Sequence, residues 1–599
     1  MEKEFSTVQN NSAISLRGFW RLFRMYLKSE EKWRAWGLLG VVIGLNFAAV
    51  YLLVRINTWY NDFYNALQNY EEQLFWPLVG EFTALAFIYI VIAVYAVYLR
   101  QMLQIKWRTW MTRQYIGNWL NNQVYRRMQI SAYGDTDNPD QRISEDINQF
   151  VALSLALLIG FLKQLTTLAA FGVVLWNLSG ALTVPIGGKE FVVYGYMFWF
   201  SLLYSTAGTF LAHLVGRKLI GLNYDQQRFE ADFRFGMMRL RENSESIAFY
   251  RGEKAEKIGF AERFAAVIKN FWQLMHQTKL LNFYVNGYAQ LAVIVPLIMA
   301  APQYFSGAMA LGGLMQTISA FGRVQDALSY FVESYDTIAQ LASVVARLEG
   351  FTAHINEATN IKSDVAFSTA DDVFSVGALT VGLPHAKNEA AKILLGDCSF
   401  CLNHGEHLLV TGASGSGKST LLRTLAGIWP FAAGRVNLPA VVENNSVVPI
   451  MFLPQKPYLP LGTLKRSLCY PLTEDVFPDD KLREILKEAA LPHLSERLGD
   501  EEDWSRILSL GEQQRLAFAR ILLAKPHCVF LDEATSALDE TREKEMYELL
   551  FANLPQTIVV SVGHRGTLFA LHDKELRFTG DGKWEFRPMT VANEEETKA

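Results

Sequence analysis

The first half of the chain alternates long apolar runs with polar, basic segments. Runs of about 18 or more residues without strong charge are long enough to cross a bilayer, and helices satisfy their backbone polar groups there. The apolar runs lie at 36–54, 82–99, 164–187, 191–212, 280–305 and 305–322. This pattern predicts an α-helical membrane domain with six transmembrane helices over residues 1–349.

Basic residues orient the predicted helices. They are frequent in 1–34, 100–149 and 216–279, whereas the loops 55–77 and 188–190 carry one each. Because positive charge favours the cytoplasmic side, we expect the N-terminus, both long basic loops and the second half of the chain to lie in the cytoplasm.

Both long basic loops have apolar residues at helical spacing, for example Trp107, Trp110 and Met111. The turn at 138–140 interrupts the first loop. We therefore expect rigid helical extensions whose tips touch a cytoplasmic domain and transmit motion to the membrane helices. The candidate coupling residues at these tips are Pro139, Asp140, Gln141, Arg142, Glu242 and Glu245.

A polar stripe follows the sixth predicted membrane helix. Its residues recur at intervals of three and four, which places them on one face of a helix. They are Arg323, Asp326, Tyr330, Glu333, Thr337 and Gln340. Ionisable residues at membrane depth often line a wet pathway, for which Arg323, Asp326 and Glu333 are the candidates. The alternative is a solvated or dimer-packing face beyond the bilayer.

The second half of the chain has a different pattern. Residues 350–372 are polar and weakly periodic, so we expect a linker there. Strand-like and helical runs alternate from 373 to 590, which predicts an α/β domain, and the polar end at 591–599 is expected to be disordered.

A phosphate-binding loop stands near the start of this α/β domain. Residues 412–420 fit the pattern G-x-x-x-x-G-K-[ST], after an apolar strand and before a helix. In this context backbone N–H groups and the helix N-terminus bind phosphate, a lysine reaches the outer phosphates, and a hydroxyl ligates Mg²⁺. The nucleotide-binding candidates here are Gly412, Ala413, Ser414, Gly415, Ser416, Gly417, Lys418, Ser419 and Thr420.

Four further candidates follow strands in the same domain. Gln455 could hold Mg²⁺ or the attacking water and sense the outer phosphate. Asp532 could hold Mg²⁺ together with Ser419 and Gln455, and the adjacent Glu533 could act as the general base. His564 could contact the outer phosphate and orient the water. Each residue alone is weak evidence, but their order and spacing agree.

A helix start at 509–512 offers a second anion site. Ser509 and Gly511 open a helix that continues through 520, and Glu512 follows them. We therefore assign Ser509, Gly511 and Glu512 to nucleotide binding.

Composition agrees with a membrane protein. Of 599 residues, 50% are hydrophobic and 19% are charged. The net charge of −4 gives no indication of a nucleic-acid partner. Residues 1–34 are polar and basic, unlike a cleavable signal peptide.

Together these motifs resemble the ATPase domain of ABC transporters. The resemblance covers the whole second half and implies ATP and Mg²⁺ as cofactors. Two departures stand out. The family signature LSGGQ appears as LSLGE at 508–512, although Ser509 and Gly511 match. The aromatic residue that usually stacks on adenine is missing from 382–385, which reads Gly-Leu-Pro-His.

The first half narrows the resemblance. The stretches 138–143, 230–235 and 241–245 resemble the SbmA/BacA-related family, and similar signals occur in the peroxisomal ABCD subfamily. We favour the bacterial branch, and therefore an inner (plasma) membrane location, because no peroxisomal address ends the chain.

The resemblance implies the exporter-type ABC fold and a mechanism. ATP would lie between the phosphate-binding loop of one chain and the signature of another, so a homodimer with twelve membrane helices is expected. It would work by alternating access in membrane lipid. We favour uptake of large hydrophilic solutes such as peptides or cobalamin. The alternatives are an exporter or flippase of lipid or fatty acyl-CoA, and an ATP-gated channel or regulator.

Overall fold

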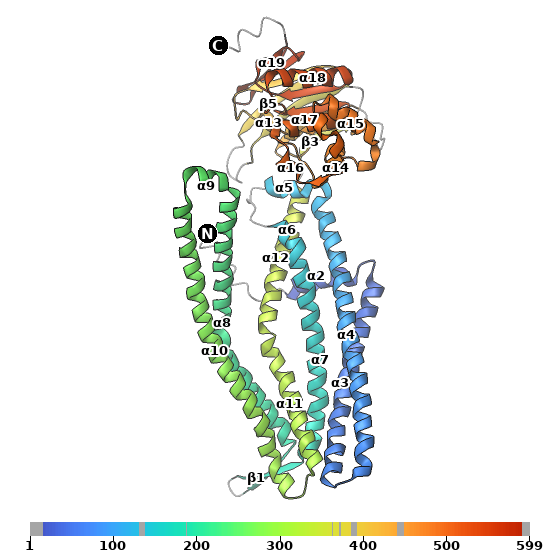
Figure 1. The fold of residues 1–599 in the computed structure, drawn as a ribbon, viewed down its shortest axis with the longest axis vertical. Helices are drawn as coiled ribbons and strands as arrows, with labels where there is room; N and C mark the ends of the chain where they lie inside the picture. The colour runs from blue at the N-terminus through green and yellow to red at the C-terminus, as the bar shows by residue number, and fades with distance from the viewer. Residues whose placement is uncertain are drawn as a thin grey trace. The chain divides into compact units, whose positions relative to one another are not determined.

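The computed structural model describes residues 16–130, 138–186, 189–361, 363–369, 373–384, 392–439 and 448–589. The chain divides into two compact units, of which the first comprises residues up to 117 and 138–352. The second comprises 118–137 and the residues from 353 onward. Figure 1 shows helices throughout the first unit and sheets in the second.

The first unit is a bundle of long helices. They are α2 (Leu16–Leu27), α3 (Lys32–Gln68), α4 (Glu72–Leu120), α6 (Pro139–Gln141), α7 (Ile147–Ser179), α8 (Tyr196–Glu242), α9 (Ser244–Tyr250), α10 (Glu253–Phe305), α11 (Leu311–Glu333) and the first part of α12 (Tyr335–Asn360). Within the described residues, five helical segments are long and apolar enough to cross a membrane, namely 32–68, 72–130, 139–179, 196–242 and 253–305. These five contain the first, second and fifth predicted membrane helices and most of the third and fourth. The fourth begins at Tyr196 rather than at 191, because residues 191–194 belong to a strand.

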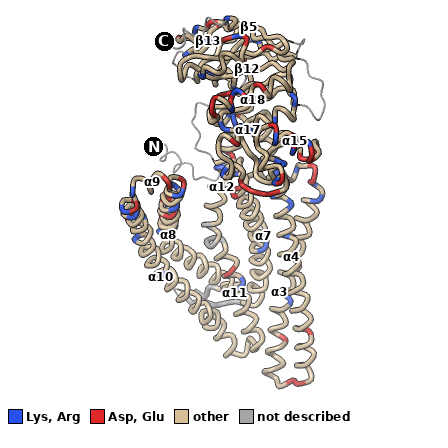
Figure 2. The backbone as a smooth tube through the Cα atoms, turned by 45° about the horizontal axis from the view of Figure 1, so that its top comes forward, with Lys and Arg blue, Asp and Glu red and all other residues tan. Residues whose placement is uncertain are grey.

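The predicted helical extensions are present. Helices α8 and α10 lie side by side and are joined at one end by the short α9 (Figure 1). Figure 2 shows charged residues gathered around α9 and long uncharged stretches farther along the pair. The expected loop at 216–279 is therefore a helical hairpin with a short tip.

The sixth predicted helix corresponds to α11, with different bounds. It begins at Leu311 rather than at 305, because α10 continues through Phe305 before the turn. Helix α11 packs against α7 and α3. Leu314, Phe321 and Val324 are buried there in an apolar cluster. It has only 23 residues and carries charges, so its place in the bundle depends on packing as well as on apolar composition.

The third predicted membrane helix was too long. Helix α7 ends at Ser179, and Gly180 adopts a left-handed φ of 61°. An antiparallel hairpin follows, formed by β1 (Ala181–Ile186) and β2 (Lys189–Tyr194), before α8 begins. The β-branched residues and Pro185 of β1 favour an extended backbone over a helix.

The linker expected at 350–372 is mostly regular structure. Helix α12 continues to Asn360, and β3 begins at Asp364. Phe351, Ile355 and Ala358 are buried and recur at helical spacing. The many polar residues between them concealed this short apolar stripe.

The second unit has the expected α/β architecture. Its six-stranded sheet has the order β14 (Lys583–Pro588), β13 (Lys574–Gly580), β6 (His407–Gly412), β12 (Ile558–Val562), β11 (Cys528–Asp532) and β8 (Ile450–Leu453). All neighbours are parallel except β13 and β14. A four-stranded sheet has the order β3 (Asp364–Thr369), β7 (Ala432–Leu438), β4 (Phe374–Gly382) and β5 (Ile393–Leu402).

Helices complete this unit. They include α13 (Lys418–Leu425), α14 (Leu464–Cys469), α15 (Asp479–Glu488), α16 (Trp504–Ile507), α17 (Leu510–Ala524), α18 (Glu540–Asn553) and α19 (Gly566–Phe569). Every residue of β12 is buried, as expected of a parallel strand covered on both faces. Parallel strands place their carboxyl ends at one edge of the sheet, where their loops can form a ligand site.

A piece of the first half of the sequence belongs to the second unit. Helix α5 (Val124–Ile130) lies in the segment 118–137. Ile130 packs against the apolar core between the two sheets, and Arg127 donates a hydrogen bond to the carbonyl of Ile361 at 3.3 Å. The membrane domain expected at 1–349 is therefore interrupted by this segment.

Candidate ATP-hydrolysis site

The phosphate-binding loop connects β6 to α13. Gly412 has a φ of 138°, and a Cβ there would lie 2.8 Å from the backbone oxygen of Phe578, so only glycine fits. The Lys418 ammonium donates to the carbonyls of Gly412 and Ala413 at 2.7 and 2.9 Å. The loop thus curls around a lysine that is only 7% exposed.

Burial sets the electrostatics of this loop. It lowers the pKa of Lys418, against the raising effect of the Glu533 and Asp532 charges. Burial also raises the pKa of Asp532, against the hydrogen bond from Ser419. Charges at such partly buried positions interact more strongly with phosphate than they would in bulk water.

Ser419 and Asp532 form the candidate Mg²⁺ site. Ser419, at the start of α13, donates a hydrogen bond to Asp532 Oδ1 at 2.9 Å. Mg²⁺ prefers oxygen ligands and commonly takes one or two from protein with the remainder from phosphate and water. A hydroxyl and a carboxylate beside the phosphate-binding loop fit that ion.

Glu533 lies at the centre of the candidate catalytic group. Its backbone has a left-handed φ of 48° at the end of β11. Gln455 Nε2 donates to Glu533 Oε2 at 3.1 Å, and His564 Nε2 lies 3.5 Å from Oε1. Residues from two other loops therefore contact this carboxylate, an arrangement suited to a general base that receives a proton from water.

A cavity of about 630 Å³ joins these residues. It is lined by Gly412, Ser414, Gly415, Gly417, Lys418, Ser419, Thr420, Glu533 and His564, and also by Leu383, Lys392 and Leu394. None of the described lining residues is Phe, Tyr or Trp. Leu383 and Leu394 give the cavity an apolar part, and His385 lies outside the described residues. Lys392 and Leu394 belong to no recognised motif, so the sequence alone did not identify them as lining residues.

The signature residues lie elsewhere in the chain. Ser509 caps α17, and Glu512 accepts hydrogen bonds from the Ser509 backbone N–H at 2.9 Å and hydroxyl at 2.7 Å. His493 Nε2 lies 3.1 Å from the other Glu512 oxygen. Of the described residues that line the cavity, none comes from 508–512. The structure therefore does not bring Ser509, Gly511 and Glu512 to the phosphate-binding loop of the same chain.

Charge compensation keeps Glu512 ionised. Burial acts to raise the pKa of its carboxyl, but the Ser509 hydrogen bonds and the nearby His493 and Arg515 lower that pKa overall. The departure from Gln to Glu is thus accommodated as a capping box, in which Ser509 and Glu512 bond reciprocally.

Gln514 connects the loops around the site, which the sequence did not reveal. It is fully buried on α17. Its side chain donates to the Gln455 carbonyl at 2.9 Å and to the Ser536 hydroxyl at 3.2 Å, and accepts from the Ala537 N–H at 3.0 Å. A displacement of the signature helix would therefore move the loop that carries Gln455.

The first candidate coupling region contains a buried charge network. Pro139, Asp140 and Gln141 form α6, and Arg142 begins a single π-helical turn. In this turn Asp146, with a side chain only 1% exposed, accepts from Arg142 at 2.8 Å. Arg347 adds two bonds at 2.7 and 2.8 Å.

The second coupling region is the tip of the α8–α10 pair. Glu242 ends α8 and Glu245 lies in α9, and both side chains are exposed. The pathway candidates Arg323 and Asp326 are also exposed along α11, whereas Tyr330 packs against Gly160 of α7. The side chain of Glu333 lies outside the described residues. A water-filled pathway and a solvated or dimer-packing face both require side chains that are exposed within one chain. Both interpretations of the polar stripe therefore remain predictions.

Two protein-family models match the chain. The model "ABC transporter transmembrane region 2" matches residues 22–305, and the model "ABC transporter" matches residues 395–536.

Relatives and a solved structure agree with these matches. An uncharacterized ABC transporter ATP-binding protein of Synechocystis is 36% identical, over 94% of this chain and 83% of the relative. The inner membrane ABC transporter ATP-binding protein YddA of Escherichia coli is 34% identical, over 90% and 92%. The human lysosomal cobalamin transporter ABCD4 is 28% identical, over 82% of each. The structure of a bacterial Atm1-family ABC exporter with ATP bound superposes with a TM-score of 0.70 at 16% identity, over 95% of this chain and 99% of that one.

Proposed function

The chain belongs to the ABC transporter family, and from this premise we propose that two copies form a homodimer that transports a large hydrophilic solute by alternating access. Family membership establishes ATP-driven transport and the exporter-type fold. The proposal adds the homodimer, uptake across a bacterial inner membrane, and a substrate such as a peptide or cobalamin. The narrower resemblance to SbmA/BacA-related proteins stays a prediction.

The separation of the two halves of the nucleotide site supports a homodimer. One cavity is lined by the phosphate-binding loop, Glu533 and His564. Ser509, in contrast, caps α17 and is not among the residues that line this cavity. A second chain that contributed Ser509 and Gly511 would complete each site, and two identical chains would complete two sites symmetrically.

The residues of one site divide the work of hydrolysis. The backbone of the phosphate-binding loop and Lys418 bind the phosphates. Ser419 and Asp532 would hold Mg²⁺, which neutralises phosphate charge when bound. Glu533 accepts a proton from a water molecule while the oxygen of that water attacks the terminal phosphorus. Gln455 and His564 orient the Glu533 carboxylate. Inorganic phosphate and ADP leave as products.

Mixed dimers test whether the sites are shared. Lys418→Ala and Ser509→Ala each disable every site of their own homodimer. When the two variants are mixed at equal amounts and allowed to exchange, each heterodimer regains one intact site, so about a quarter of all sites are restored. The measurement is single-turnover ATP cleavage in the mixture. Cleavage no greater than that of either variant alone would refute the shared site.

Exposed charges on α11 support a hydrophilic substrate. Arg323 and Asp326 are not covered within one chain, and such residues suit a water-filled path between two chains. The name of the cobalamin transporter relative also indicates a large polar solute. We expect reconstituted protein to accumulate a fluorescent polar peptide or cobalamin inside liposomes that enclose ATP, because only chains whose ATPase faces the lumen are then energised and uptake moves solute toward the ATPase side.

Export or flipping of lipid or acyl-CoA is the second candidate, because the superposed structure is an exporter. In that case acyl-CoA, and not the polar solutes, would stimulate ATP hydrolysis in the same liposomes. A channel or regulator would give unitary currents with ATP, but the presence of Glu533 favours a hydrolysing pump.

Coupling is proposed to pass through the two tips described above. Pro139, Asp140, Gln141 and Arg142 lie beside the buried Asp146 network, so this tip is stiff. Glu242 and Glu245 offer exposed charges at the other tip. Disulfide cross-links from either tip to the ATPase domain that block transport but not ATP binding would support this assignment, and freely transporting cross-linked protein would contradict it.

A further inference from the structure

Helix α2 has one face packed on the bundle and one face of exposed cations. Leu22, Phe23 and Tyr26 are 1–5% exposed. The rings of Phe23 and Tyr26 lie 5.2 and 5.5 Å from that of Trp107. This contact fixes the helix in place, so its outer side is a preformed surface.

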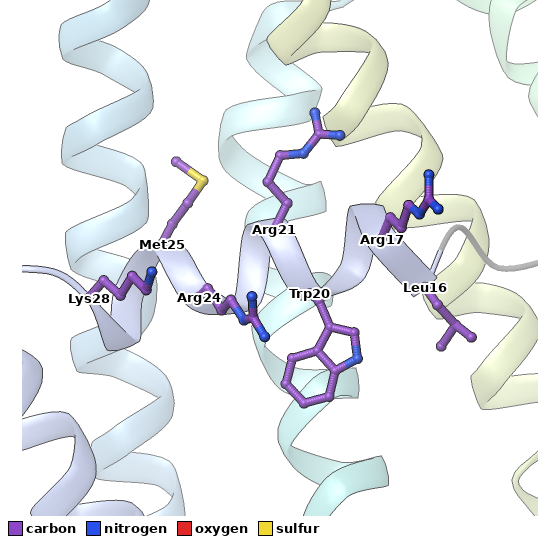
Figure 3. Close-up of a pocket in the computed structure, with 7 residues that line it drawn as sticks. All are labelled: Leu16, Arg17, Trp20, Arg21, Arg24, Met25 and Lys28. Carbon is purple, nitrogen blue, oxygen red and sulfur yellow. The ribbon is translucent and has the colours of Figure 1, made fainter.

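We define the basic face of α2 as the outer side that surrounds a shallow cavity of about 550 Å³ (Figure 3). Its residues are Leu16, Arg17, Trp20, Arg21, Arg24, Met25 and Lys28. The four basic side chains are exposed, and no acidic residue occurs between 16 and 29. Arg17, Arg21 and Arg24 therefore concentrate positive charge on one side of the twelve-residue α2, and Lys28 follows directly after its last residue.

Few protein groups neutralise this face. Among the described residues, Arg21 meets Glu349 at 3.5 Å, and Arg17, Arg24 and Lys28 form no ion pair. Arg24 instead lies 5.9 Å from the centre of the Trp20 ring. The arrangement leaves cations and an exposed indole available to a partner with both negative charge and apolar chains.

The sequence position of α2 puts it at the cytoplasmic surface of the membrane. Only four residues separate it from α3, the first membrane helix. Trp33 and Trp36 at the start of α3 are 81% and 54% exposed, and Trp20 is 45% exposed. Exposed tryptophans mark the boundary between headgroups and hydrocarbon, and clustered basic residues there attract anionic lipids of the cytoplasmic leaflet.

We propose that the basic face of α2 is a binding surface for anionic phospholipid headgroups. The phosphates pair with Arg17, Arg24 and Lys28, while Trp20 and Leu16 insert among the upper acyl chains. This surface shares no residue with the nucleotide site or with the candidate coupling residues, and the proposal depends on neither the substrate nor its direction. It predicts that anionic lipid is a bound component of the working transporter.

The test uses the full-length protein in phosphatidylcholine vesicles that contain either brominated phosphatidylglycerol or brominated phosphatidylcholine. Bromine quenches the fluorescence of nearby indoles. The contribution of Trp20 is the quenching that is seen in the unmodified protein and is absent from the Trp20→Phe variant. We expect stronger quenching by phosphatidylglycerol, with a preference that falls about fivefold for each of Arg17, Arg24 and Lys28 changed to Gln. High salt should reduce the preference of the unmodified protein.

A matched control removes the same charge elsewhere. The triple change of Lys254, Lys257 and Lys269 to Gln, all exposed on α10, should leave the lipid preference unchanged. Equal quenching by both lipids in the unmodified protein would overturn the proposal. So would protection of Trp20 from both lipids, which would indicate a second copy of the chain on this face. Competition by millimolar inorganic phosphate would indicate a soluble anion site instead.

The salt dependence needs only the unmodified protein and Trp20→Phe, in which every charge is kept. The test therefore stands even if the variants that remove basic residues from α2 fail to fold. Loss of ATP hydrolysis or of solute uptake would not move these quenching ratios. Failure of the proposed transport function is therefore distinguishable from failure of this inference.

Discussion

Replacing Glu533 by Gln should stop ATP hydrolysis and leave ATP binding intact. Gln has nearly the same shape, and its carbonyl oxygen can still accept the hydrogen bond that Gln455 donates at 3.1 Å. The left-handed backbone at φ 48° constrains both side chains alike, so strain cancels in the comparison. What is lost is the group that takes the proton.

The expected size follows from that role. A positioned general base contributes about 10²–10⁴-fold in rate, which is roughly 2.7–5.5 kcal/mol of barrier. Phosphate release by purified protein should fall by this factor, while the dissociation constant for ATP changes by less than about threefold.

Asp532→Asn is the matched comparison. It removes one charge from the adjacent residue but disturbs the partner of Ser419, so it should weaken Mg²⁺-dependent ATP binding as well as hydrolysis. If Glu533→Gln hydrolyses ATP at the parental rate, Glu533 is not the base, and the assignment of Gln455 and His564 as its orienting partners fails with it.

Three further outcomes test the geometry. Glu512→Gln should keep the helix cap but weaken the hydrogen bond from the Ser509 hydroxyl, because the acceptor oxygen loses its charge. The hydroxyl then binds phosphate more readily, which should lower KM for ATP by roughly fivefold, about 1 kcal/mol; a raised KM would contradict this. Asp146→Asn should destabilise the protein by about 3 kcal/mol, because Arg142 and Arg347 lose their buried charged partner. Thermal unfolding in detergent measures this loss, and Asp140→Asn, at an exposed position, should change the unfolding temperature little. Burial lowers the pKa of His572 to about 4 from the ordinary 6.5. Between these values the unfolded chain takes up a proton that the folded chain does not, so the free energy of unfolding should decline by about 3 kcal/mol as the pH falls from 6.5 toward 4. The unfolding temperature should fall over the same range, and His572→Gln should flatten that fall.

Much of the fold followed from the sequence because its signals are local. Apolar runs predicted the long helices, and strand–loop–helix spacing placed the phosphate-binding loop between β6 and α13. Order along the chain also put Asp532 and Glu533 at the end of β11, beside Ser419 and Gln455. These residues converge because parallel strands deliver their ends to one edge of a sheet.

The remainder depends on contacts between distant segments. Asp146 and Arg347 are 201 positions apart and meet only after the bundle forms. Gln514 belongs to no recognised motif position, yet it joins the loops that carry Gln455 and Ser536. The hairpin after α7 was missed because its residues are apolar enough to continue a membrane helix, and only backbone preference distinguishes the two.

The crossing of α5 into the second unit limits how this protein can be taken apart. A soluble fragment that starts at residue 353 would lack Ile130 and Arg127, leaving apolar surface and the Ile361 carbonyl uncovered. Adding a synthetic peptide of 118–130 to such a fragment should improve its solubility. No single cut in the polypeptide separates the second unit from the first. Residues 118–137 belong to the second unit but lie in the sequence between two segments of the first unit.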